Sequence, residues 1–102
     1  MYLMDFSVVP IGQGESVGQW VAQCVDLVAA SGLDYRLHAM GTSVEGELPD
    51  LLALLQKCTE TVATQCSRVT VTAKFDYRAG RSGMLDSKVA SIEQRLGKKL
   101  PH

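Results

Sequence analysis

The sequence predicts an α+β fold: a ferredoxin-like βαββαβ sandwich with a four-stranded antiparallel sheet, two helices on one face and an extra C-terminal helix. One observation is the order of patterns along the chain, which is strand, helix, strand, strand, helix, strand and helix. A second is that the two middle strands are close enough in sequence to form a hairpin. Two right-handed strand–helix–strand crossovers joined by a hairpin give this sandwich.

The first strand and the first helix have clear patterns. Residues 2–9 alternate between apolar and mixed side chains, as in a strand with one buried face. A helix is predicted over residues 16–31 and closes at Gly32. Ser16 and Gln19 have the spacing of a capping box at its start. Its apolar face carries Val17, Trp20, Val21, Cys24, Val25 and Val28.

The middle of the chain predicts a hairpin followed by a second helix. Residues 35–40 and 43–46 are the two expected strands. Gly41-Thr42 between them fits a two-residue type II′ turn, which favours glycine at its first position. Pro49 suits the first turn of the second helix. The predicted apolar face of that helix comprises Leu48, Leu51, Leu52, Leu55, Cys58, Thr59 and Val62.

The C-terminal part predicts a long strand and a third helix. Residues 68–78 alternate cleanly and form the fourth strand. Its helix-facing side chains are expected to be Val69, Val71, Ala73, Phe75 and Tyr77. The third helix ends at Gly97, and its apolar positions are Leu85, Val89, Ile92 and Leu96.

Composition excludes several classes of protein. A chain of 102 residues suits one domain, residues 1–102, and 46% hydrophobic residues suffice for a core. Ten basic and eleven acidic residues give a net charge of -1, which argues against nucleic acid as a partner. No apolar run approaches the ~20 residues of a membrane span. The first ten residues lack a basic region and are interpreted as a strand, not a signal peptide, so we expect a cytoplasmic protein with no membrane partner.

The three cysteines predict neither a disulfide framework nor a metal site. Cys24, Cys58 and Cys66 are odd in number and widely spaced, and no Cys/His spacing matches zinc. Cys24 and Cys58 fall on apolar helix faces, as small core residues do. We therefore expect no metal and no cofactor.

The sheet face away from the helices is the first candidate site. Its expected side chains are Leu3, Asp5, Ser7, Thr70, Thr72, Lys74 and Asp76. Antiparallel sheets tolerate a solvated face, but this mixture also suits a small pocket or an oligomer interface. The third helix is a further candidate to cover part of it.

Other ligands of such sandwiches fit less well. The fourth strand lacks the aromatic pattern of an RNA-recognition module. The first loop lacks the CxxC of a metal carrier. Its Gly12-Gln13-Gly14 is only weak support for an anion site, and a flexible loop is the favoured explanation.

The stretch MGTSVEGE, residues 40–47, raises a question of orientation. Ser43 and Glu45 are two residues apart and so share one face of a short strand. If they face away from the helices, they join Ser7 and Asp76. If they face the helices, Glu45 points into the helix layer and its assignment to a ligand site fails.

Several spaced motifs carry a resemblance to a known family. They are Ser7-Val8-Val9-Pro10-Ile11-Gly12, Ser16-Val17, Ser31-Gly32-Leu33-Asp34-Tyr35, Met40-Gly41-Thr42 and Glu45-Gly46-Glu47. With these motifs in this order and at this spacing, the chain resembles the thiamine-binding-like family related to the YkoF-type proteins. The resemblance runs from about residue 3 to residue 97. The resemblance implies homo-oligomers, as dimers or dimers paired into tetramers, without catalytic activity. It also implies binding of thiamine or its hydroxymethylpyrimidine part.

The resemblance and the chemistry of the ligand together give the predicted site. Thiamine combines a cationic thiazolium with a flat aminopyrimidine. Carboxylates pair with the cation, and hydroxyl or backbone groups satisfy the ring nitrogens. The predicted ligand-binding residues are Ser7, Gly41, Thr42, Ser43, Glu45 and Asp76.

Two alternatives remain open at the level of the sequence. The protein can be a structural or interaction module whose open sheet face serves only oligomerisation. An enzyme is less favoured, and its candidate groups are Glu45, His38 and Asp76. The carboxylates and hydroxyls of the predicted ligand site do not form a nucleophile, base and orienter set.

Overall fold

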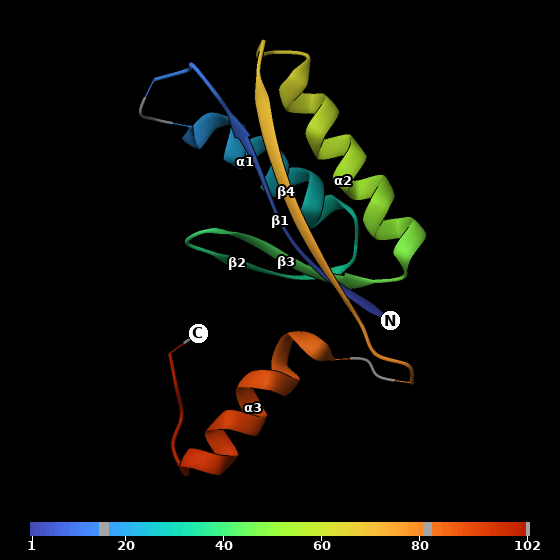
Figure 1. Ribbon diagram of the computed structural model, residues 1–102, viewed down its shortest axis with the longest axis vertical. Coiled ribbons are helices and arrows are strands. Elements are labelled where there is room, and N and C mark those ends of the chain that lie inside the picture. Colours follow the sequence, from blue (N-terminus) through green and yellow to red (C-terminus); the bar gives the residue numbers. More distant parts are fainter. Residues whose placement is uncertain (15–16, 81–82, 102) are drawn as a thin grey trace.

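The computed structural model describes residues 1–14, 17–80 and 83–101 (Figure 1). It contains the strands and helices β1 (Tyr2–Pro10), α1 (Gly18–Ala30), β2 (Asp34–His38), β3 (Gly41–Gly46), α2 (Leu48–Ala63), β4 (Val69–Tyr77) and α3 (Met84–Leu96). The sheet has the order β2-β3-β1-β4, and each neighbouring pair is antiparallel. The predicted α+β sandwich is confirmed. No helix among the described residues is long and apolar enough to cross a bilayer.

Strict alternation along β1 builds the core. Met4, Phe6 and Val8 are buried, whereas Asp5 and Val9 are exposed. The buried side chains of β1 pack against α1 and α2, which cover the same face of the sheet. The helices contribute Trp20, Cys24, Val28, Leu51, Leu54, Cys58 and Val62 to this core.

The hairpin turn lies two residues earlier than the sequence predicts. His38 pairs with Gly41, so the connection is Ala39-Met40 and not Gly41-Thr42. Both turn residues have negative φ, which excludes a type II′ turn. Gly41 is instead needed inside the sheet, because a Cβ there would lie 2.6 Å from the Phe6 carbonyl oxygen.

The helices also depart from prediction in detail. α1 begins at Gly18 with Val17 in the N-cap position and without a side-chain cap; Ser16, the predicted cap, lies outside the described residues. Gly32 has the expected left-handed conformation, with φ +76°. In α2 the buried face carries Leu54, while Leu52, which was predicted to be buried, is exposed.

β4 and α3 extend beyond the two-helix layer. β4 is an edge strand whose helix-facing side is only partly covered, so that Val71 and Tyr77 are exposed. α3 projects below the sheet in Figure 1. The radius of gyration is 15.0 Å, against about 13 Å for a compact chain of this length, because α3 reaches outward.

Candidate functional site

The strand register brings polar side chains together on the face of the sheet away from α1 and α2. Arg36, Ser43, Asp5 and Lys74 form one row across the four strands. The next row consists of Asp34, Glu45, Leu3 and Asp76. Ser43 and Glu45 therefore face away from the helix layer, together with Ser7 and Asp76.

A hydrogen-bonded group centred on Asp5 joins the hairpin to β1. His38 Nε2 lies 2.7 Å from Asp5 Oδ1, and Ser43 Oγ donates to the same oxygen at 3.1 Å. The Met40 backbone N–H donates to His38 Nδ1 at 3.2 Å. With Nδ1 as the acceptor of this bond, Nε2 is the ring nitrogen that donates to the carboxylate.

Glu45 is buried beneath the start of α3. Its side chain is 4% exposed. Oε1 accepts the Gly83 backbone N–H at 3.0 Å, and Oε2 accepts that of Met84 at 2.9 Å. A carboxylate is stabilised there by the unpaired N–H groups and the positive end of the helix dipole. Both oxygens of this predicted ligand residue are thus engaged within the chain.

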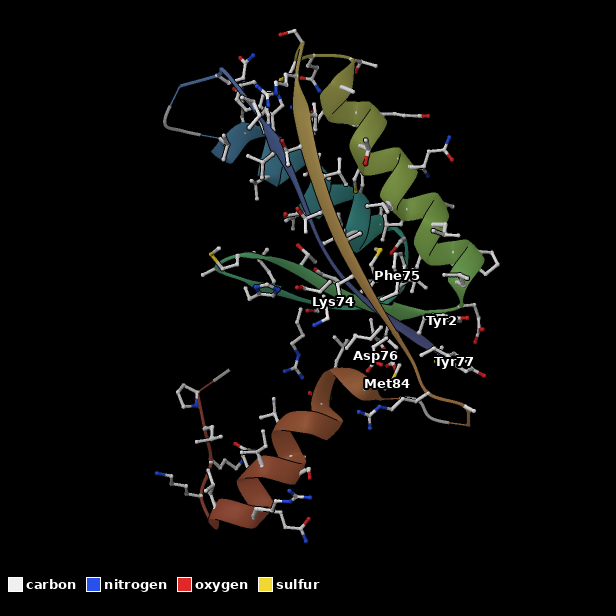
Figure 2. The ribbon with its side chains drawn as sticks, in the orientation of Figure 1. Tyr2, Lys74, Phe75, Asp76, Tyr77 and Met84 are labelled. Carbon is white, nitrogen blue, oxygen red and sulfur yellow. The ribbon has the colours of Figure 1, made fainter. Side chains whose placement is uncertain are left out.

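Further contacts fix the start of α3 on the sheet. Arg36 forms an ion pair with Asp86 in the first turn of the helix. Met84 is buried and points from the start of α3 toward the sheet (Figure 2). A polar cavity of about 280 Å³ remains beside Arg36, Glu45 and Asp86. At the end of β4, Arg78 Nε lies 3.7 Å from Asp76 Oδ2.

An apolar cavity lies on the other side of the sheet, between α1 and the hairpin. Its volume is about 290 Å³. The walls come from the ends of β1, β2 and β3 and from one side of α1; they include Phe6, Val8, Val21, Cys24, Leu37 and Thr42. Met40 at the tip of the hairpin is 84% exposed and lines the same cavity. An open apolar hollow with a few polar groups is the usual form of a small-molecule site.

The predicted ligand residues divide between these two places. Gly41 and Thr42 line the apolar cavity, and Ser7 also borders it, although its side chain belongs to the opposite face of the sheet. Thr42 is buried and pairs with Phe6 on the helix side of the sheet. Ser43, Glu45 and Asp76 belong to the opposite face, so the structure does not bring all six together.

Sequence reasoning missed the apolar walls of the cavity. Val21 and Cys24 share the apolar face of α1 and were assigned to the core. Helical periodicity alone does not distinguish a side chain that packs in the core from one that lines a cavity. Leu37 and Met40 give the only sequence signal, as apolar residues at the end of a hairpin.

A third cavity, of about 380 Å³, lies between α1 and α2. It is lined by Leu27, Ala30, Ser31, Leu33, Asp50, Ala53, Leu54 and Lys57. None of the predicted ligand residues borders it.

Residues 4–93 match the family described as thiamine-binding protein. The chain belongs to this family. A UPF0045 protein of Synechocystis sp. is 40% identical over 95 residues, covering 92% of this chain and 78% of that protein. A UPF0045 protein of Mycobacterium bovis is 38% identical, covering 92% of this chain and 93% of that protein.

Solved structures support the fold of this thiamine-binding family member. The crystal structure of the protein MJ1052 from Methanocaldococcus jannaschii superposes with a TM-score of 0.84. The two chains are 27% identical, and the match covers 91% of this chain and 96% of the other. The family match spans both the apolar cavity and the contact between Glu45 and α3.

Proposed function

We propose that the protein binds thiamine or a related pyrimidine, such as hydroxymethylpyrimidine, in the cavity between α1 and the hairpin, and that it does so without catalysis. Membership of the thiamine-binding family carries this proposal. The apolar cavity, which borders three of the predicted ligand residues, supports its location.

The cavity offers suitable chemistry for a flat heteroaromatic ring. Phe6, Val21 and Leu37 provide apolar walls against which a ring can lie. The Thr42 hydroxyl is both donor and acceptor and can satisfy a ring nitrogen or an exocyclic amino group. We propose that the pyrimidine occupies this part of the cavity.

The cationic thiazolium would lie toward His38. This side chain lines the cavity and is hydrogen-bonded to the Asp5 carboxylate. Asp5 then supplies the negative charge, partly screened because it is exposed. In this arrangement His38 is held by both Asp5 and Met40 and serves binding, not proton transfer.

Calorimetric titration tests the proposal. Thiamine and hydroxymethylpyrimidine should each give a saturable heat with the wild-type protein. Thr42→Val keeps the shape of the side chain but removes the hydroxyl, so affinity should fall about tenfold, as expected for the loss of about 1.4 kcal/mol. Thr72→Val, on the exposed edge strand, is the control and should bind normally. An absence of heat at millimolar ligand refutes the proposal.

We also propose that the protein is a cytoplasmic homo-oligomer, a dimer or tetramer. Support comes from α3, whose outer apolar side chains Ile92 and Leu96 are 49% and 56% exposed. A second copy that covers them would remove apolar surface from water. The three cysteines are free thiols, in keeping with a reducing compartment.

Light scattering tests the assembly. Ile92→Glu should lower the molar mass, because it places a charge in the apolar stripe of α3. Gln94→Glu adds the same charge at another exposed position of the helix and should leave the mass unchanged. A monomeric wild type contradicts the proposed homo-oligomer, and equal molar masses for the two variants contradict the contact through α3. Neither outcome bears on the proposed binding of thiamine.

A further inference from the structure

Two buried cysteines face each other where α1 crosses α2. Cys24 Sγ lies 3.9 Å from the Cys58 carbonyl oxygen, and Cys58 Sγ lies 3.8 Å from the Cys24 carbonyl oxygen. These reciprocal contacts bring each side chain against the backbone of the other helix. A disulfide needs two cysteine side chains that approach one another from nearby backbones. The pair has no part in the proposed binding of thiamine.

The two thiols differ in access. Cys24 lines the apolar cavity and is 8% exposed, whereas Cys58 is fully buried behind it. A small reagent that enters the cavity therefore meets Cys24 first. The third thiol, Cys66, lies just after α2 and is not part of the cavity wall.

The two thiols also differ in acidity. Hydrogen bonding from the Cys58 thiol lowers the pKa of Cys24, although burial opposes this shift. The same hydrogen bond and burial raise the pKa of Cys58. Since the thiolate is the reactive form, Cys24 is the nucleophile of the pair and Cys58 the thiol that reacts second.

We propose that Cys24 and Cys58 form a redox-active dithiol, which small peroxides reach through the cavity and convert to a disulfide between α1 and α2. The inference goes beyond thiamine binding and stands even if the cavity holds no ligand. A dithiol reductant would reverse the reaction.

The chemistry balances with hydrogen peroxide as the oxidant. The Cys24 thiolate attacks one peroxide oxygen; an S–O bond forms, the O–O bond breaks and hydroxide leaves, which gives a sulfenic acid at Cys24. Cys58 gives its proton to that hydroxide and attacks the Cys24 sulfur. The S–S bond forms, the S–O bond of the sulfenic acid breaks, and the hydroxide that leaves takes up the proton first lost by Cys24. Two thiols and one peroxide thus yield one disulfide and two waters.

Mass spectrometry of the reduced protein tests the proposal. After treatment with hydrogen peroxide and alkylation of the remaining thiols, the protein should have lost two hydrogen atoms and carry one alkyl group, at Cys66. Peptide mapping should find the Cys24–Cys58 link. Alkylation at all three cysteines after excess peroxide, or a disulfide that involves Cys66, overturns the proposal.

Single variants assign the two roles. Cys58→Ala should stop at a sulfenic acid on Cys24 that dimedone traps, while Cys24→Ala should prevent oxidation at Cys58. Cys66→Ala should form the disulfide like the wild type. If dimedone traps a sulfenic acid on Cys58 instead of Cys24, the assignment of the two roles is overturned. The wild-type experiment decides the proposal even if a core variant does not fold.

A matched pair of variants tests the route of entry. Val21 lines the cavity and is accessible enough to accept a larger side chain. Val21→Phe should slow disulfide formation several-fold. Ala22→Phe adds the same ring on the exposed side of α1 and should not. Equal rates in both variants overturn the role of the cavity as the entry path.

Discussion

Glu45 and Met84, far apart in the sequence, are joined by a hydrogen bond of 2.9 Å from the Met84 backbone N–H to Glu45 Oε2. The other oxygen accepts the backbone N–H of Gly83. A strand residue thereby supplies the N-terminal cap that α3 does not find in its own sequence, since Gly83 has no side chain to provide one. The position of α3 is set by a buried carboxylate in the sheet.

Glu45→Gln should release the start of α3. The neutral amide keeps one acceptor oxygen but turns an NH₂ group toward a backbone N–H, which leaves a buried donor unpaired. We expect a loss of about 1–3 kcal/mol, seen as faster hydrogen exchange of the α3 amides. Glu47→Gln, at a neighbouring exposed position, is the control. Unchanged protection of α3 in Glu45→Gln would refute the capping role.

Asp86→Asn should have a much smaller effect than Glu45→Gln. The ion pair between Arg36 and Asp86 lies at the surface, with side chains that are 41% and 66% exposed. Exposed pairs of this kind contribute less than about 1 kcal/mol, and salt screens them. Urea unfolding at low and high salt should show a small difference from wild type that disappears at high salt. A large, salt-independent loss would contradict this interpretation.

Gly41→Ala should destabilise the sheet. The added methyl group would lie 2.6 Å from the Phe6 carbonyl oxygen, so β1 and β3 must move apart. We expect a loss of about 1–3 kcal/mol and a fall in Tm of roughly 4–8 °C for each kcal/mol. Gly18→Ala is the matched control, because a Cβ there meets nothing within 4 Å. Equal melting temperatures for the two variants would contradict the proposed role of Gly41.

Gly41 also illustrates what the sequence alone could predict. The period-two pattern of β1 and the helical patterns of α1 and α2 follow from local sequence, and these elements were predicted correctly apart from their ends. A glycine between two strands favours a turn on local grounds. The true reason for Gly41 is the close approach of β1, which comes from far away in the sequence and leaves no local signal.

The candidate site could likewise be predicted only in part from local sequence. Alternation predicts that Ser43 and Glu45 share a face, but only the register decides which one. The donors to Glu45 belong to α3, so its burial could not be read from residues 40–47. Thr42 illustrates the opposite case: it was expected beside Ser43 at one site, yet adjacent strand residues point to opposite faces, and Thr42 lines the apolar cavity instead.

Bound thiamine should protect Cys24 from alkylation. If the ligand occupies the cavity between α1 and the hairpin, it covers the path to this thiol. Saturating thiamine should therefore slow modification of Cys24 by iodoacetamide and leave the rate at Cys66 unchanged, as followed by peptide mass spectrometry. Thiamine that binds by calorimetry but leaves the Cys24 rate unaltered must lie elsewhere, for example at the polar cavity beside Glu45.

The pH dependence of Cys24 alkylation should reveal its hydrogen bond to Cys58. The Cys58 thiol donates to Cys24 and lowers its pKa, so the Cys24 thiolate forms at lower pH than in an ordinary cysteine. The alkylation rate should rise with pH and reach half its maximum below the midpoint of an unfolded control peptide that contains Cys24.

Cys58→Ala removes the donor but leaves Cys24 beside the cavity. The midpoint should move to higher pH, since burial alone raises the pKa of a thiol. Cys66→Ala should keep the wild-type profile. A midpoint that does not move in Cys58→Ala would mean that Cys58 does not activate Cys24, and the order of reaction proposed for the two thiols would then have to be abandoned.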